Sequence, residues 1–101
     1  MDSLFDNLPD SPLPDELFDP IATGNAFTLK RIISTGQLTD WHNQADNEWL
    51  VILKGSARLL FDGEEEKTLK TGDCLLIPAQ KRHRVTYTEN PTVWLVLHFE
   101  D

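Results

Sequence analysis

The sequence contains a single cysteine, Cys74, so no disulfide can form within one chain. Its apolar runs are far shorter than the ~20 residues that a membrane-spanning helix needs. The N-terminus carries neither a basic segment nor a long apolar one, which argues against a secretory signal. These absences favour a reduced, cytoplasmic protein. Because Cys74 lies in an apolar run, we expect a buried and inert thiol.

Basic residues are also scarce, since 9 Lys and Arg face 17 Asp and Glu and the net charge is -8. Nucleic acids and anionic membranes bind through clustered Lys and Arg, so we expect neither as a partner. The excess acid is concentrated in the first twenty residues, which contain no Lys or Arg. The remainder of the chain is close to neutral.

No segment shows a sustained helical period, and a chain of 101 residues is one domain by size. Short β-branched and apolar runs begin at Phe27 and are separated by Gly, Asp and Asn, a pattern typical of an antiparallel sandwich or barrel. Tight turns are indicated at Lys54-Gly55, Asp62-Gly63 and Asn90-Pro91. We therefore predict an all-β domain with strands near residues 27–34, 48–54, 57–61, 67–70, 73–77, 83–89 and 92–99.

Residues 1–26 differ from the rest, because they combine spaced acids, four prolines and recurring Leu, Phe and Ile. The prolines exclude a long helix, although residues 15–18 could form one helical turn. We predict an N-terminal arm over residues 1–26 that packs on the domain, or on a partner subunit, and a β-barrel over residues 27–101. Apolar residues on both faces of the strand at 48–54 favour a homodimer.

Two motifs carry the candidate chemistry. In the first, His42 follows Gly36 after five residues, Gln44 and Glu48 come next, and Gly55 closes the motif. This spacing resembles the first motif of the cupins, with Gln44 in the position of that motif's second histidine. The resemblance implies a jelly-roll β-barrel, as found in small single-domain cupins.

The second motif contains Gly72, Pro78 and His83 at the spacing of the second cupin motif. Gln80 and Tyr87 replace its glycine and asparagine. Together the two motifs cover residues 36–87. The resemblance implies that the conserved side chains of both motifs meet in the cavity of the barrel.

The resemblance implies a metal site made of His42, Gln44, Glu48 and His83, and Fe, Mn, Ni or Zn are all compatible with it. Two histidines and a carboxylate leave positions open for a substrate. The alternative is that a cupin lacking one ligand no longer binds metal and uses the cavity to bind or sense a small ligand. Whether the protein is an enzyme stays open; a dioxygenase or an isomerase would be the expected type.

Strand alternation places side chains two apart on one face, so Leu50 and Ile52 should point inward with Glu48. By the same parity, Tyr87 should share a face with His83, where it could donate or accept a proton.

The remaining candidates are weaker. His98 belongs to neither motif, and we expect a satisfied or surface histidine that is not a ligand. We expect Lys81, Arg82 and Arg84 to form a solvated turn. Of the three tryptophans, Trp41 is the best placed for ligand contact.

Overall fold

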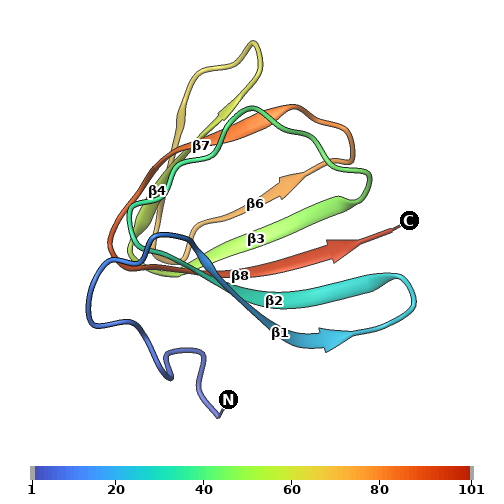
Figure 1. Cartoon of the computed structure of the whole chain (residues 1–101). Helices are drawn as coiled ribbons and strands as arrows, with labels where there is room; N and C mark the ends of the chain where they lie inside the picture. The colour runs from blue at the N-terminus through green and yellow to red at the C-terminus, as the bar shows by residue number, and fades with distance from the viewer. Residues whose placement is uncertain (1, 101) are drawn as a thin grey trace.

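Two antiparallel sheets of five and three strands form the fold in the computed structural model, which describes residues 2–100 (Figure 1). No helix capable of crossing a membrane occurs within that range. The all-β class and the jelly-roll type of barrel are confirmed. The strands are β1 (Leu17–Thr23), β2 (Phe27–Ser34), β3 (Asn47–Lys54), β4 (Ser56–Phe61), β5 (Lys67–Lys70), β6 (Cys74–Ile77), β7 (His83–Thr88) and β8 (Thr92–Phe99).

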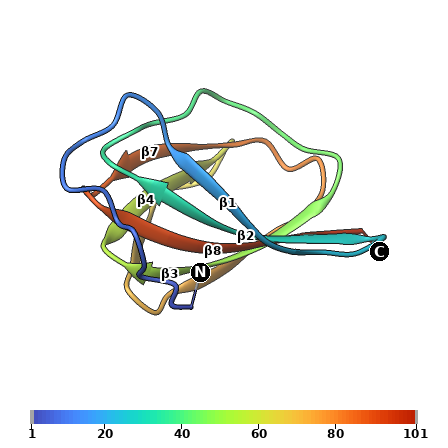
Figure 2. The same cartoon turned by 60° about the horizontal axis from the view of Figure 1, so that its bottom comes forward.

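The larger sheet has the strand order β1-β2-β8-β3-β6, and the smaller one has the order β5-β4-β7. The two sheets face each other, as the turned view shows (Figure 2). Leu50 and Ile52 of β3 are buried between them against Leu59 of β4 and Trp94 of β8. The inward parity of β3 is therefore confirmed.

Strand β1 is the element that the sequence did not reveal. It pairs with β2 along residues 17–23, whereas we expected strands only from Phe27 onward and a helical turn at residues 15–18. The reason is that β1 is an exposed edge strand with no alternation of buried and exposed residues. Pro20 also interrupts its pattern, at a register irregularity between Pro20 and Ala22. The boundary at residue 26 stays a prediction, with β1 on its N-terminal side.

The first residues of the chain are tied to the outer face of the larger sheet by Arg31 of β2. This side chain is only 3% exposed. Its guanidinium donates to the carboxylate of Asp19 at 2.8 and 3.0 Å and to the carbonyl oxygens of Leu4 and Asp6 at 3.0 and 2.6 Å. The acidic N-terminal segment thus packs on the barrel of its own chain.

Cys74 is exposed, so the expectation of a buried thiol is wrong. It lies on β6, the edge strand opposite β1, and is the register partner of Val51. Both belong to the outer face of the larger sheet, over which residues 2–100 form no second layer of secondary structure. An apolar run on an edge strand does not imply burial.

Candidate functional site

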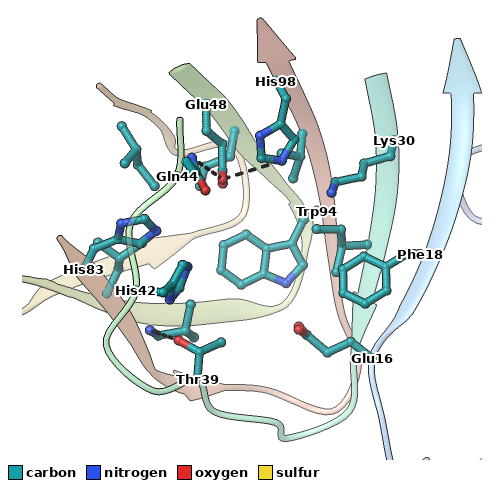
Figure 3. A pocket seen from close by; sticks show the side chains of 16 residues that line it. Glu16, Phe18, Lys30, Thr39, His42, Gln44, Glu48, His83, Trp94 and His98 are labelled. Atoms are coloured by element: carbon teal, nitrogen blue, oxygen red, sulfur yellow. Dashed lines mark hydrogen bonds and ion pairs between the residues drawn. The ribbon is translucent and has the colours of Figure 1, made fainter. Parts of the chain in front are cut away.

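A cavity of about 240 Å³ lies between the sheets (Figure 3). Its floor is apolar, formed in part by Leu50, Ile77 and Trp94. All four residues of the predicted metal set, His42, Gln44, Glu48 and His83, line the cavity. Four further polar residues that line it come from other positions: Glu16, Lys30, Thr39 and His98.

The two motif histidines are joined by their backbones. His42 and His83 form an isolated antiparallel bridge, in which each amide donates to the other residue's carbonyl oxygen at 2.9 Å. Their ring centroids lie 4.2 Å apart. The loop before β3 is therefore fixed to the start of β7, and the two motifs meet as the sequence indicated.

Each imidazole is also held by a carbonyl oxygen. Nδ1 of His42 lies 2.9 Å from the carbonyl oxygen of Asp40, and Nδ1 of His83 lies 2.8 Å from that of Lys81. A carbonyl oxygen can only accept, so both Nδ1 atoms must carry the proton. In the neutral rings, both Nε2 atoms are consequently hydrogen-bond acceptors.

Burial lowers the pKa of His83, and the neighbouring His42 lowers it further. The hydrogen bond to the Lys81 carbonyl and the charge of Glu48 act in the opposite direction, but the net direction is downward. The imidazole of His83 is thus favoured in its neutral form, with its Nε2 lone pair available.

Glu48 is engaged on the other side of the cavity. Its Oε1 accepts from the side-chain amide of Gln44 at 3.0 Å and lies 3.7 Å from Nε2 of His98. Nδ1 of His98 is 3.4 Å from a carboxylate oxygen of Asp46. His98 therefore lines the cavity as a histidine with two carboxylate neighbours, and its exclusion from the ligand set stays a prediction. It is the register partner of Glu48 on β8, a relationship that depends on strand pairing and not on either motif.

These contacts divide the predicted metal set into two pairs, His42 with His83 and Gln44 with Glu48. Within residues 2–100, no three His, Cys, Asp or Glu side chains form a group that could hold a metal ion. The two imidazole nitrogens suit a metal, but Oε1 of Glu48 is directed to Gln44 and His98 and not to the two histidines. As they are arranged, the four side chains do not fit a metal site.

Sequence reasoning missed the wall of the cavity formed by the N-terminal region. Glu16 accepts a hydrogen bond from the hydroxyl of Ser34, which in turn accepts from the indole Nε1 of Trp94 at 2.9 Å. Phe18 and Lys30 lie beside them on β1 and β2 (Figure 3). Only the pairing of β1 with β2 brings these residues to the cavity, and neither motif indicates it.

Tyr87 does not line the cavity, so the parity argument is wrong for this residue. A register shift between Arg58 and Leu59 of β4, opposite Val85 and Tyr87, breaks the alternation of β7. Tyr87 is 41% exposed and lies beside Arg58, whose guanidinium carbon is 5.3 Å from the ring centroid.

Trp41 is likewise outside the cavity wall, with the guanidinium carbons of Arg82 and Arg84 at 4.6 and 5.7 Å from its ring. Trp94, and not Trp41, is the tryptophan that lines the cavity.

A two-sheet jelly roll with its motif histidines at an internal cavity defines a cupin-type barrel. A family model described as the cupin domain matches residues 31–98, and the chain belongs to this family. A search of curated proteins found no match.

Among solved structures, one similar chain is a protein of Ralstonia eutropha JMP134 provisionally named a mannose-6-phosphate isomerase. It shares 34% identity over 100% of this chain and 98% of its own, with a TM-score of 0.94. A cupin superfamily protein of Desulfitobacterium hafniense DCB-2 shares 19% identity over 92% of this chain and 84% of its own, with a TM-score of 0.79.

A DMSP lyase of Ruegeria pomeroyi DSS-3 shares 24% identity over 77% of this chain and 40% of its own, with a TM-score of 0.69. The Desulfitobacterium and Ruegeria structures support the fold alone.

Proposed function

We propose that this cupin binds a small organic molecule in its cavity and that it needs no metal to do so. The observation that carries the proposal is that the four motif side chains form two separate pairs, His42 with His83 and Gln44 with Glu48, while the carbonyl oxygens of Asp40 and Lys81 leave both Nε2 atoms as acceptors. Two adjacent Nε2 acceptors at the wall of a largely apolar cavity suit the hydroxyl groups of a ligand.

The relative from Ralstonia eutropha makes sugar phosphates the first compounds to test, because its provisional name is that of a mannose-6-phosphate isomerase. Isomerisation of a sugar needs a group that removes a proton from the carbon next to a carbonyl. An imidazole held neutral can accept such a proton, and the lowered pKa of His83 supports this role.

The experiment is an NMR titration of chelator-treated protein with mannose 6-phosphate, with mannose as the neutral comparison. We expect saturable shifts of the His42 and His83 ring signals and at least tenfold weaker binding by His42→Ala. Asn43→Ala, an exposed neighbour, is the matched control and should bind as the unmodified protein does. Equal binding by His42→Ala would contradict the assigned site. So would the absence of saturable shifts with these sugars and with the three-carbon compounds described below.

Metal binding is the second candidate, and one observation favours it. A metal-ligating histidine usually donates its other ring N–H to a carbonyl or carboxylate, as both His42 and His83 do. Fe, Mn, Ni or Zn would then be held by the two imidazoles. Glu48 and Gln44 could become the other two ligands only if the contacts of Glu48 with Gln44 and His98 were broken.

Elemental analysis of protein purified without chelator tests this second candidate. One equivalent of metal per chain, lost in both His42→Ala and His83→Ala, would establish a metal site. Metal content far below one equivalent, even after incubation with each of the four ions, would favour metal-free ligand binding.

We also propose that two copies associate through the outer face of the larger sheet. Leu29, Leu97, Trp49 and Leu76 form one cross-strand row on that face, and Leu76 is 52% exposed. Such a continuous apolar row on a sheet face suits a partner surface. Light scattering at micromolar concentration should give the mass of two chains; the mass of one chain would contradict the proposal.

A further inference from the structure

The cavity contains one basic residue, although the protein as a whole is strongly acidic. Of the 9 Lys and Arg in the sequence, all of which lie within the described range, only Lys30 lines the cavity. It lies on β2, paired with Pro20 of β1 and Val96 of β8. Its side chain is half-buried and extends toward the cavity, on the side where Phe18 and Glu16 also lie (Figure 3).

The ammonium group of Lys30 has no anionic partner within residues 2–100. Its Nζ lies over the ring of Phe18, 5.4 Å from the ring centroid. Three of the other basic side chains have carboxylate partners: Arg31 pairs with Asp19, Lys81 with Glu64 and Arg82 with Asp62.

Glu16 lines the same end of the cavity but makes no ion pair with Lys30. Its carboxylate is held by the hydroxyl of Ser34, which is fully buried and is itself fixed by the indole of Trp94. Glu16 is thus positioned as an acceptor and not as the counterion of Lys30.

The polar groups of the cavity fall into three sets, one of which, Gln44, Glu48 and His98, is already joined through Oε1 of Glu48. Lys30 lies on the side of β1 and β2, whereas His42 and His83 lie across the face of Trp94 on the opposite side (Figure 3). The end at Lys30 offers a positive charge beside the carboxylate of Glu16, and the end at the two histidines offers neutral acceptors, with an apolar floor between them. A ligand that satisfies both ends carries an anionic group and, a few carbon atoms away, hydroxyl groups.

We propose that Lys30 is the subsite for an anionic oxygen group, a carboxylate or a phosphate ester, of a small hydroxylated ligand whose other end reaches His42 and His83. This inference rests on the proposed function, because it assigns the ligand class of the same cavity. The limited volume of about 240 Å³ favours a compact molecule. The hydroxyl groups nearest Lys30 would donate to the carboxylate of Glu16.

The test is an NMR titration of chelator-treated full-length protein with three matched three-carbon probes: glycerate, glycerol 3-phosphate and glycerol. The signals followed are the Trp94 indole and the rings of His42 and His83. The variants are Lys30→Met, Lys30→Arg and, as the matched control for loss of one positive charge, Lys70→Met on the exposed strand β5.

We expect the unmodified protein and Lys70→Met to bind at least one of the two anions more tightly than glycerol. Lys30→Met should weaken anion binding about ten- to a hundredfold, the size of a hydrogen bond to a charged group, and leave glycerol unaffected. Lys30→Arg, which keeps the charge, should retain the preference for anions. Tighter binding of glycerate would identify the anionic group as a carboxylate, and tighter binding of glycerol 3-phosphate would identify it as a phosphate ester.

Three results would overturn the inference. Unchanged anion binding by folded Lys30→Met would show that Lys30 is not the subsite. Equal binding of glycerol and both anions would remove the anionic requirement while the proposed function stands. If no probe shifts the cavity signals, the inference fails together with the proposed function.

Discussion

His42 and His83 are paired through their backbones as well as through their rings. Each amide donates to the other residue's carbonyl oxygen at 2.9 Å, and the ring centroids are 4.2 Å apart. The bridge connects a loop before β3 to the first residue of β7. The bridge therefore fixes the backbones that carry the two rings, and the carbonyl oxygens of Asp40 and Lys81 hold the rings through Nδ1.

The two histidines should differ in their effect on stability. His83 is 2% exposed, so His83→Ala leaves a void and deprives the Lys81 carbonyl of its donor. We expect a loss of about 1–3 kcal/mol in the free energy of unfolding. His42 is exposed, and His42→Ala should cost less than about 1 kcal/mol. Urea denaturation measures both values; equal losses would contradict the assigned burial.

Stability should depend on pH through His83. Its pKa is lowered in the folded state, so between that value and the unfolded value of about 6.5 only the unfolded chain binds the proton. The free energy of unfolding should fall as the pH decreases below about 6.5, until the folded-state pKa is passed.

His83→Gln is the reference variant for this pH dependence. The unmodified protein and the variant both contain His42 and His98, so a difference between their pH profiles reports on His83. The difference in stability between the unmodified protein and His83→Gln should shrink on acidification in chelator-containing buffer. Parallel pH profiles from urea denaturation would show that His83 has no lowered pKa.

The sequence predicted the motif-bearing part of the barrel well, because its strands have apolar runs bounded by Gly, Asp and Pro. It also brought His42 together with His83. Three features of the structure could not be predicted from the sequence. Strand β1 has no burial alternation, the irregularity in β7 reverses the face of Tyr87, and the proximity of His98 to Glu48 depends on the β3–β8 register. Each of these is a property of strand pairing, which local pattern does not encode.

Two glycines with similar backbone angles give a matched test of close packing. Gly55 has φ +85 and Gly63 has φ +80, but a Cβ at Gly55 would lie 2.5 Å from the carbonyl oxygen of Pro91, whereas one at Gly63 meets nothing within 4 Å. Gly63→Ala should cost about 1–2 kcal/mol from backbone strain alone. Gly55→Ala should cost at least about 1 kcal/mol more because of the steric overlap. Equal costs in thermal unfolding would contradict this packing.

Arg31 should hold the N-terminal segment on the barrel. Arg31→Met removes the donors to Asp19, Leu4 and Asp6, and we expect a loss of about 2–3 kcal/mol, moderated because the Asp19 side chain is 37% exposed. Limited proteolysis should cleave the variant near its N-terminus faster than the unmodified protein. Lys70→Met is the matched control; the same protection in both variants would show that Arg31 does not anchor the segment.

The most direct test of the central claim is long-range ¹H–¹⁵N NMR of the histidine rings in chelator-treated protein, followed by addition of one equivalent of Zn²⁺. The account predicts protonated Nδ1 and unprotonated Nε2 in both His42 and His83, with ring signals that stay unchanged on addition of the ion. Signals of both rings that shift and saturate at one Zn²⁺ per chain would contradict it and establish a metal centre in the cavity.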